Sequence, residues 1–418
     1  MTGSACVRRD NCRLCGSRDL VAVLNLTPTP PANAFVGADQ LHTPQPTFPL
    51  DLFMCGNCRH VQLLDVVDPE ILFADYVYVS GTSPVFVKHF ENFAKSIMQD
   101  CVPKPAGKLA VDIGSNDGTL LSKFKAAGMT VLGVDPARKI ARTATENGIE
   151  TWPAFFTSDL ASRILEQRGR AQIVTANNVF AHADDLAGIV EGIKLLLAPD
   201  GVFVFEVSYL LDVYEKTLFD TIYHEHLAYH TVKPLQAFFA AQDMALINVE
   251  RIDSHGGSLR GTVQHAAGPR AVSSSVNELI TTEAEHGLHD PAGLQSFGDR
   301  IVEVGQELST HLAAAKSAGL RVAGFGAPAK ATTLMYHFGI GPDVIDFIVD
   351  DSPLKQGLYS PGMHIPVVSS GEIIVRKPDV ILILAWNFAK PIMQNHSEFL
   401  DQGGQFVVPL PNLEVISR

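Results

Sequence analysis

The sequence has no excess of positive charge, no leader pattern at its N-terminus and no apolar run long enough to cross a membrane. Its 418 residues include 32 Lys and Arg against 45 Asp and Glu, a formal net charge of −13. Because nucleic-acid phosphates are bound by basic surfaces, this balance argues against a nucleic-acid partner, although a local pocket can still hold a small anion. A membrane helix needs about 20 mainly apolar residues, and a signal peptide needs a charged segment before its apolar core. We therefore expect a cytoplasmic protein that acts as a monomer, without nucleic-acid or membrane partners.

Cysteine is also scarce, with six residues in the whole chain, too few for a disulfide framework. Four of the six form two C-x-x-C pairs, Cys12 with Cys15 and Cys55 with Cys58. Each pair places two thiolates on one tight turn, and two such turns supply the four ligands of a tetrahedral zinc ion. Four thiolates leave no open coordination position, so we expect a structural zinc and not a catalytic one. Unligated buried cysteines and redox use are the alternatives.

Repeats of short period are absent too, and composition divides the chain into three blocks. Residues 1–80 are rich in proline and hold most of the cysteines, and residues 81–262 alternate helical patterns with short apolar runs. Residues 263–418 begin with a long helical pattern and then show the same alternation. A chain of this length suggests two to three domains, each burying a core. We therefore predict a small zinc-binding domain followed by two α/β domains.

The apolar runs of the second and third blocks have the length of buried strands. In the second block they cover 108–113, 131–134, 173–175 and 202–207, the last of them after a Pro-Asp-Gly turn at 199–201. In the third block a helical pattern over 276–317 precedes runs at 320–325, 344–349, 380–384 and 405–408. This alternation predicts mostly parallel sheets with helices on both faces, and hence two Rossmann-like units.

The first run of the second block leads into VDIGSNDG at residues 111–118, a glycine-rich loop with an acid before its first glycine. Gly114 and Gly118 let the backbone approach a ligand closely, and Asp135, after the next run, can accept both hydroxyls of a ribose. Counted from Asp112 the spacing is D-x-G-x-x-x-G, a wider loop that suits a nucleoside with an amino-acid tail better than a pyrophosphate. We therefore expect an S-adenosylmethionine pocket and a methyltransferase. An NAD or FAD site is the alternative.

Two further pairs of side chains are candidates for contact with this cofactor. Asn116 and Asp117 lie in the loop where the amino and carboxylate groups of the ligand are expected. Phe155 and Phe156 follow the third apolar position and could flank an adenine ring, and we take Phe156 as the cofactor-binding residue. Packing roles are equally open for both pairs.

The segment ANNVFAH at 176–182 follows the strand expected to end at Thr175. Loops at the carboxyl ends of parallel strands line the ligand crevice. Asn177 and Asn178 are thus placed to contact the cofactor, and His182 to face the acceptor. Helix capping by the asparagines is the alternative.

A second cluster of titratable groups is IYHEH at 222–226, with Tyr229 and His230 soon after it. In a helix, Tyr223, His226 and His230 would share a face, whereas in an extended segment His224 and His226 would pair. A histidine near its ordinary pKa can abstract a proton at neutral pH, with a tyrosine hydroxyl to stabilise the oxyanion. We expect acid–base catalysis here, with metal binding or a structural histidine cluster as alternatives.

These motifs together resemble one enzyme family. The paired C-x-x-C, VDIGSNDG, ANNVFAH, IYHEHLAY, SHGGSLR (254–260) and GFGAPAKATTL (324–334) are similar to those of the deoxysugar C-methyltransferases of antibiotic and surface-sugar pathways. The likeness covers essentially the whole chain. It implies a class I S-adenosylmethionine methyltransferase core at 81–262, a zinc-binding domain at 1–80 and a Rossmann-like C-terminal domain at 263–418.

The resemblance also implies a reaction. Such enzymes transfer a methyl group from S-adenosylmethionine to a carbon, usually C-3, of a nucleotide-linked 4-keto-deoxysugar, with dTDP as the expected nucleotide. The ketone acidifies the neighbouring C–H, and a histidine removes the proton. His226 matches this base, and Tyr223, Glu225 and His182 match its supporting positions. A tyrosine from the end of the zinc-binding domain also enters the site, and Tyr76 is its match, with Tyr78 close by as a substrate-binding residue.

In the family the C-terminal unit helps to hold the nucleotide-sugar, which matches Gly324, Gly326, Lys330 and Asp350 here, with His255 in the SHGGSLR segment. The second glycine loop can present backbone N–H groups to a diphosphate, with Lys330 as a point charge. An NAD site or a purely packed αβ domain is the alternative for this unit. For the whole chain, methylation of a sugar oxygen or nitrogen and an NAD-dependent oxidoreductase are the alternatives.

Overall fold

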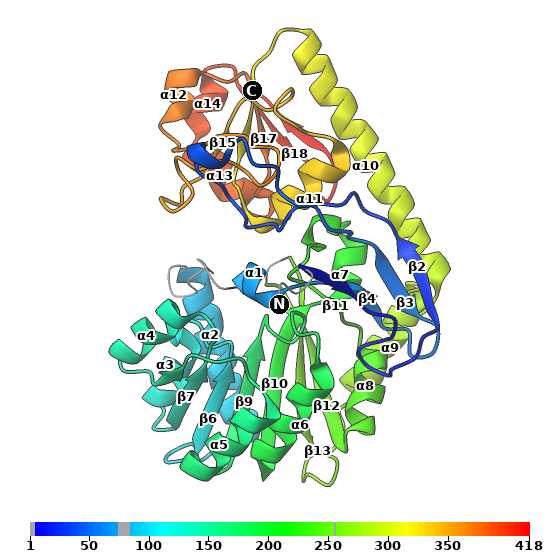
Figure 1. Ribbon diagram of the computed structural model, residues 1–418, viewed down its shortest axis with the longest axis vertical. Helices are drawn as coiled ribbons and strands as arrows, with labels where there is room; N and C mark the ends of the chain where they lie inside the picture. The colour runs from blue at the N-terminus through cyan, green and yellow to red at the C-terminus, as the bar shows by residue number, and fades with distance from the viewer. Residues whose placement is uncertain (1–4, 74–83, 255) are drawn as a thin grey trace.

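The computed structural model describes residues 5–73, 84–254 and 256–418. Three of the expected site residues, Tyr76, Tyr78 and His255, lie outside this part of the chain. Figure 1 shows the central domain at the bottom, the C-terminal domain at the top and the N-terminal strands β2, β3 and β4 at one side, near the place where the two meet. The α/β fold class with two Rossmann-like units is confirmed.

The N-terminal domain is built on small antiparallel sheets. Its main sheet has the order β11-β4-β3-β2, in which β11 comes from the central domain and pairs Ala228 with Gln62 and Tyr229 with Val61. A second ladder joins β1 to β5. The zinc-binding part is therefore continuous with the central domain through a shared sheet. Its elements are β1 (Cys6–Arg8), β2 (Leu20–Leu24), η1 (Ala38–Gln40), β3 (Leu52–Cys55), β4 (Val61–Leu63), β5 (Asp65–Val67) and α1 (Pro69–Phe73).

The central domain has a seven-stranded sheet of order β12-β13-β10-β9-β6-β7-β8, in which only β13 runs antiparallel to its neighbours. The parallel strands are rich in Val, Ile and Leu and buried, as expected when helices cover both faces. The four predicted runs lie in strands, except for Lys108, which precedes β6. The strands are β6 (Leu109–Ile113), β7 (Thr130–Val134), β8 (Thr151–Trp152), β9 (Ala171–Asn177), β10 (Leu197–Ser208), β12 (Met244–Ile252) and β13 (Ser258–His265).

Helices flank this sheet (Figure 1), and a 3-10 helix and a short strand come after β10 and α7 in the chain. They are α2 (Pro84–Cys101), α3 (Thr119–Ala126), α4 (Arg138–Glu146), α5 (Ser158–Arg168), α6 (Leu186–Leu196), α7 (Leu210–Glu215), η3 (Phe219–Thr221), β11 (Ala228–Tyr229) and α8 (Val232–Ala241). The Pro-Asp-Gly turn expected at 199–201 is not a separate turn. Leu197 already pairs with Ala171, and the ladder resumes at Val202 after a shift of register, so these residues form a bulge within β10.

The C-terminal domain repeats the Rossmann arrangement with a six-stranded sheet of order β16-β15-β14-β17-β18-β19. The expected strand at 344–349 is paired only at 348–349, because the N–H groups of Val344 and Ile345 bond back to Gly341 in a turn. Its elements are β14 (Val322–Phe325), α11 (Ala329–Phe338), β15 (Ile348–Val349), β16 (Val367–Val368), α12 (Glu372–Arg376), β17 (Val380–Ile383), η4 (Trp386–Phe388), α13 (Ala389–Asn395), α14 (Ser397–Asp401), β18 (Gln405–Val408) and β19 (Glu414–Ile416).

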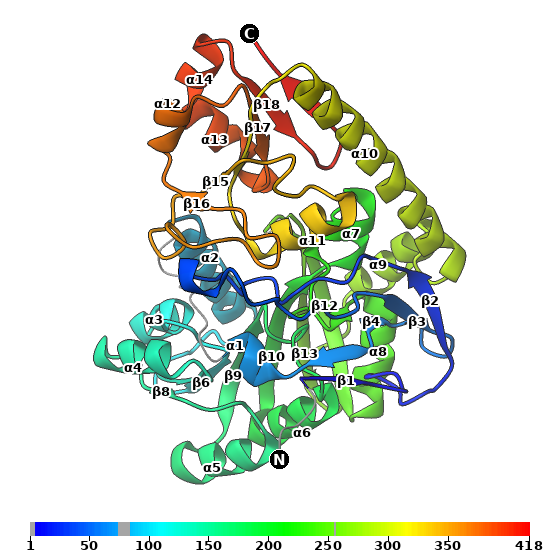
Figure 2. The same ribbon diagram turned by 45° about the horizontal axis from the view of Figure 1, so that its top comes forward.

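The helical pattern at 276–317 is divided between α9 (Ser274–Glu285) and α10 (Pro291–Ser317). The side chain of Asp290 accepts a hydrogen bond from the N–H of Ala292, and Pro291 begins the new helix, so a cap separates the two. Helix α10 runs from the central domain along the C-terminal domain (Figures 1 and 2) and packs on β2 and β14. The predicted domain boundary at 262/263 lies within β13.

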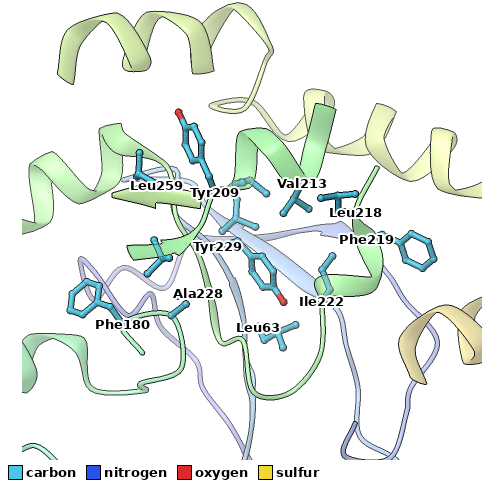
Figure 3. Packing of buried hydrophobic residues seen from close by; sticks show 14 of the residues in the cluster. Leu63, Phe180, Tyr209, Val213, Leu218, Phe219, Ile222, Ala228, Tyr229 and Leu259 are labelled. Carbon is cyan, nitrogen blue, oxygen red and sulfur yellow. The ribbon is translucent and has the colours of Figure 1, made fainter. Parts of the chain in front are cut away.

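One buried apolar cluster contains residues from all three domains. Figure 3 shows part of it around the segment from Leu218 to Tyr229, with Leu63 of β4 on one side and Tyr209 and Phe180 of the central domain nearby. Phe219, Ile222 and Tyr229 are fully or almost fully buried. The segment that carries the IYHEH motif is therefore held in the core at the junction of the three domains.

Candidate active site and zinc centre

The four cysteines of the N-terminal domain come together as predicted. Their Sγ atoms lie within 4.8 Å of one another, with Cys12 and Cys58 3.6 Å apart and Cys15 and Cys55 also 3.6 Å apart. These separations are close to the edge of roughly 3.8 Å expected for a tetrahedron with Zn–S bonds of about 2.3 Å. The donor set and the spacing fit zinc.

The two cysteine turns have the same backbone geometry. The N–H of Gly16 donates to the carbonyl of Cys12 and the N–H of Arg59 to that of Cys55, each at 2.9 Å. Gly16 and Arg59 end the turns with φ of 71° and 70°, in the left-handed region. The sequence repeat C-x-x-C is therefore a structural repeat, with one half of the metal site on each turn.

The glycine loop of the central domain joins β6 to α3 and lies against the segment after β9. Gly114 has φ of 68°, and a Cβ added to it would lie 2.3 Å from Val179 Cγ2. Gly118 is also left-handed, with φ of 78°. Only glycine fits Gly114 without a shift, so the loop keeps its backbone open for close approach by a ligand.

Asp135 links the loop to the end of β7. Its Oδ2 accepts from the N–H of Asn116 and its Oδ1 from the N–H of Ala137, each at 2.8 Å. Burial raises the pKa of this carboxyl. Each carboxylate oxygen can accept a further hydrogen bond, so Asp135 can hold the loop and a ribose hydroxyl together.

Three other polar residues near the loop make hydrogen bonds within the protein. Asp112 accepts from Thr175 Oγ1 at 2.6 Å, a buried link between β6 and β9, and burial raises its pKa to about 7. Asp117 Oδ1 accepts from both the N–H and the Oγ1 of Thr119, the first residue of α3, so this side chain binds the start of the helix. Asn178 is left-handed and its N–H donates to the carbonyl of Glu206.

Asn177 differs, because both polar atoms of its amide are buried without a partner among the described residues. A buried, unsatisfied amide at the carboxyl end of a parallel strand costs free energy unless a ligand or water satisfies it. Together with the open backbone at Gly114, this amide fits the polar groups of S-adenosylmethionine.

Of the two phenylalanines expected near the adenine, only one is accessible. Phe155 is 47% exposed, whereas Phe156 is 7% exposed and packs against Gly192 of α6. The side chain of Phe156 thus lies in the core of the central domain.

The motif at 222–226 forms neither a helix nor a strand but a tight turn, closed by a hydrogen bond of 2.8 Å from the N–H of His226 to the carbonyl of Tyr223. The rings of Tyr223 and His226 have centroids 4.1 Å apart, and the ring of His182 lies 4.9 Å from His226 at 77°. The structure therefore brings together His182, Tyr223 and His226 as the resemblance implies.

Because the segment is a turn, neither of the two arrangements considered for it, the helical face and the extended histidine pair, occurs. His224 turns away and donates from Nε2 to the carbonyl of Phe48 at 3.1 Å. His230 lies in another place, with its ring between Phe180 and His60. The physical reason is the pairing of β11 with β4, which extends the chain after Leu227 and separates His230 from the turn.

The tautomer of His226 follows from its partner. Its Nδ1 lies 2.7 Å from the carbonyl oxygen of Thr221, and because a carbonyl can only accept, the proton is on Nδ1. The lone pair is then on Nε2, the atom available to take a proton. Burial lowers the pKa of His226 to about 4 and that of His182 to about 3, so both rings are neutral at pH 7.

Glu225 is held by a residue that the sequence did not suggest. Its Oε1 accepts from Asn33 Nδ2 of the N-terminal domain at 2.7 Å, and burial raises its pKa to about 7. Asn33 lies in the proline-rich segment, where no local pattern marks it. The N-terminal domain thus contacts the same turn through Asn33 and through the carbonyl of Phe48.

The second glycine loop, after β14, is held by its own chain. Gly326 has φ of 87°, and a Cβ on Gly324 would meet Leu384 within the sheet. Asp350 accepts from the N–H of Ala327 at 2.7 Å, and Lys355 Nζ donates to the carbonyl of Ala327 at 2.8 Å.

Lys330, expected to act as a point charge on a diphosphate, has partners in this structure. Its Nζ is 3.7 Å from the centroid of the Trp386 ring, and its charge acts on Asp220 of η3. Trp386 Nε1 donates to Asp220 Oδ2 at 2.6 Å. The lysine is thus directed toward the junction with the central domain.

Family models match the chain in three consecutive parts: a zinc binding domain at residues 12–73, a methyltransferase domain at 86–249 and a C-methyltransferase C-terminal domain at 253–411. The C-methyltransferase NovU of Streptomyces niveus is 36% identical over 411 residues, which cover 98% of this chain and 97% of NovU. A ubiquinone biosynthesis O-methyltransferase of Ralstonia nicotianae is 32% identical over 116 residues, 26% of this chain and 49% of its own.

Two solved structures that resemble part of the chain illustrate the similarity. Magnesium protoporphyrin IX methyltransferase of Synechocystis, with bound S-adenosylhomocysteine, is 16% identical with a TM-score of 0.32, covering 42% of this chain and 82% of its own. The PH0226 protein of Pyrococcus horikoshii is 13% identical with a TM-score of 0.37, covering 47% of this chain and 98% of its own.

Within the described residues, no helix is both long and apolar enough to span a membrane. The methyltransferase domain uses S-adenosylmethionine, and the four-cysteine cluster of the zinc binding domain holds zinc. Similarity to NovU over almost the full length of both chains, with the three domain models in order, confirms the predicted relationship. The chain belongs to the C-methyltransferase family.

Proposed function

We propose that this enzyme methylates a carbon, at C-3, of a nucleotide-linked 4-keto-deoxysugar, with dTDP as the nucleotide. The observation that carries the proposal is the state of His226, whose Nδ1 is fixed on the Thr221 carbonyl so that a neutral Nε2 is left free beside Tyr223 and His182. A carbon has no acidic proton of its own, so carbon methylation needs a positioned base next to an activating group. The ketone of the substrate supplies that activation.

The residues suggest how the proton moves. His226 Nε2 takes the proton from the carbon next to the ketone, and the electrons of the C–H bond pass into an enolate. Tyr223 lies against His226 and is placed to stabilise the enolate oxygen, a role in which a hydroxyl donor is typical. S-adenosylmethionine, when bound, supplies a methyl group already activated on a sulfonium, so alignment and a base are sufficient and no metal is needed. His226 then loses its proton to solvent.

On the donor side, the open backbone at Gly114 and Gly118 would lie against the cofactor, Asp135 would accept a ribose hydroxyl and Asn177 would satisfy its buried amide. Asp112 and Asp117 would act mainly by holding the loop. On the acceptor side, the C-terminal unit would help to hold the nucleotide, without the N–H of Gly326, which donates to the carbonyl of Val349.

The proposal is tested with a panel of 4-keto nucleotide-sugars, in two assays. With S-adenosylmethionine we expect a methylated product whose new C–C bond is located at C-3 by NMR. With S-adenosylhomocysteine in D₂O we expect deuterium to enter the same position, which reads the base step alone. Methylation at oxygen or nitrogen, without exchange at carbon, would contradict the proposal.

The turn offers a matched pair of variants for these assays. His226→Asn removes the base and should lower both rates by about a thousandfold, within the range for loss of a general base. His224→Asn changes a histidine on the same turn that points to Phe48 and should keep most of the activity. Binding of S-adenosylhomocysteine should be unchanged in both. Equal losses in the two variants would show that the turn needs histidines for folding only.

A further inference from the structure

A buried polar cluster joins the C-terminal domain to the short 3-10 helix η3 that precedes the catalytic turn. Asp220 of η3 is fully buried, and its Oδ2 accepts the indole N–H of Trp386 at 2.6 Å. Lys330 Nζ lies 3.7 Å from the centre of the same indole ring. Helix α11, which carries Lys330, packs against η3. The three side chains thus meet across the boundary between the domains.

This cluster holds the residue that orients His226. Thr221, whose carbonyl accepts from His226 Nδ1, is flanked by Asp220 and Ile222. Asp220 is bound by Trp386, and the carbonyl of Ile222 accepts from Thr333 Oγ1 of α11 at 2.8 Å. Both neighbours of Thr221 are therefore fixed by the C-terminal domain.

The electrostatics explain why the three groups occur together. A buried carboxylate is costly unless charge and hydrogen bonds compensate it, and Asp220 Oδ1 has no hydrogen-bond partner among the described residues. Burial raises the pKa of Asp220, whereas Lys330 and the Trp386 N–H lower it. The ammonium of Lys330 is in turn stabilised by the indole face, as expected for a cation over tryptophan.

We propose that Asp220, Trp386 and Lys330 are positioning residues, through which the C-terminal domain fixes the Thr221 carbonyl and so the orientation of the proposed base His226. The proposal rests on the proposed function and gives Lys330 a role in place of the expected contact with the diphosphate. It makes the C-terminal domain part of the catalytic machinery of the central domain, beyond any role in binding the substrate.

The two tryptophans of the chain give a matched test. Trp386→Phe keeps an aromatic ring under Lys330 but removes the N–H that binds Asp220. Trp152→Phe removes an indole N–H that donates to Glu150 Oε1 at 3.0 Å on the surface. We expect Trp386→Phe to lower kcat and the deuterium exchange rate by about tenfold, with the KM for the nucleotide-sugar unchanged, because a small displacement of the base slows the chemical step. Trp152→Phe should change none of these quantities.

Lys330→Met separates the positioning role from the diphosphate role. A positioning role predicts a kcat several-fold lower with an unchanged KM for the nucleotide-sugar. If KM rises tenfold or more while kcat stays the same, Lys330 binds the substrate and the proposal is overturned. Equal rates in Trp386→Phe and the wild type would overturn it too.

A measurement without substrate keeps this test independent of the proposed function. Imidazole ¹⁵N shifts report which ring nitrogen carries the proton, and the His226 signal is the one that disappears in His226→Asn. We expect the Nδ1-protonated form in the wild type and in Trp152→Phe, and a mixture of tautomers in Trp386→Phe. An unchanged His226 signal in Trp386→Phe would reject the positioning role. If the wild type shows this signal but neither methylates nor exchanges any 4-keto nucleotide-sugar, the proposed function fails and the tautomer data still decide the positioning role.

Discussion

The central and C-terminal Rossmann-like units place an acid at the same point of the fold. Asp135 follows β7 and Asp350 follows β15, in each unit the strand beside the one that leads into the glycine loop. Each carboxylate accepts one N–H from the loop and one from the residue two positions after the acid. The two acids therefore share one structural task, which is to hold the loop against the next strand.

The difference lies in what remains available for a ligand. In the C-terminal unit Lys355 Nζ is 3.8 Å from Asp350 and also donates to the carbonyl of Ala327. A lysine of the same unit therefore already pairs with the acid and binds the loop. In the described residues Asp135 has no ion-pair partner, and its loop, residues 114–118, is longer than the loop at 326–328. A repeated fold motif thus does not imply a second cofactor site. The open carboxylate in the central unit favours a ribose there and disfavours an NAD site in the C-terminal unit.

Zinc removal should have the largest effect on activity, and it should affect the central unit without affecting the C-terminal unit. The zinc-binding sheet continues into the catalytic turn through β4 and β11, and structural zinc contributes about 10–16 kcal/mol in small domains. Cys55→Ser should therefore lose zinc and methyl transfer together, while hydrogen exchange in the C-terminal unit remains as in the wild type. Metal analysis, the activity assay and exchange by mass spectrometry measure these.

Cys101→Ser is the matched control, because Cys101 lies outside the four-cysteine cluster. It should keep both zinc and activity. A folded Cys55→Ser protein that is metal-free and fully active would contradict the structural role of the zinc.

The two glycine loops can be compared by the same substitution. Gly114→Ala places a Cβ 2.3 Å from Val179 at a left-handed position, and Gly326→Ala places one 2.4 Å from Ala385 at another. Both should lower the melting temperature, since each forces a shift and adds backbone strain of about 1–2 kcal/mol. Only Gly114→Ala should weaken the binding of S-adenosylhomocysteine, by about a hundredfold, as measured by calorimetry. A similar loss of affinity in Gly326→Ala would place cofactor contacts in the C-terminal unit.

Substitution of Asp135 and of Asp350 should show the same contrast, with a smaller effect on the affinity for S-adenosylhomocysteine. Asp135→Asn keeps the shape of the side chain but exchanges one acceptor oxygen for a donor, and a hydrogen bond to a charged group contributes about 1.5–3 kcal/mol. We expect S-adenosylhomocysteine to bind about tenfold more weakly. Asp350→Asn should leave this affinity unchanged and lower only the melting temperature, because Lys355 loses its anion. Equal affinity losses would mean that the shared loop bond, and not the ribose, sets the effect of Asp135.

The sequence predicts best those features that depend on nearby residues. The cysteine pairs, the glycine loop at 111–118 and the buried strands of both units could be found because spacing and apolar runs are local signals. The turn at 223–226 could not be found from periodicity, because the pairing of Ala228 and Tyr229 with β4, about 165 residues earlier, decides its shape. For this reason the sequence did not indicate that His224 and His230 lie away from His226.

Contacts between domains left no local signal at all. The hydrogen bond from Asn33 to Glu225 joins residues 192 positions apart, and that from Trp386 to Asp220 joins residues 166 positions apart. Lys330 fits the expected pattern of a phosphate-binding lysine after a glycine loop, yet its ammonium group lies over the indole ring of Trp386. The partner of a charged side chain at a domain boundary depends on how the two domains pack. The sequence pattern of one domain carries no information about that packing.

Acid should also distinguish the stability of the two units. His182, His224, His226 and His230 are buried in the central unit, and burial lowers each pKa to about 3 or 4. The unfolded chain, with a histidine pKa near 6.5, binds protons that the folded chain does not, so stability is full above that pH and falls as the pH drops through it toward 4. Asp112 and Glu225 have the opposite sign: burial raises the pKa of each to about 7, so their contributions are present at low pH and are lost as the pH rises toward 7. At pH 5 a single such histidine lowers the free energy of unfolding by about 2 kcal/mol.

Hydrogen exchange at pH 7 and pH 5 should therefore show the central unit opening before the C-terminal one. In His226→Gln the difference between the two units should be smaller by the contribution of one histidine. Simultaneous opening of both units, with the same pH dependence in His226→Gln, would show that these histidines are not neutral in the folded protein.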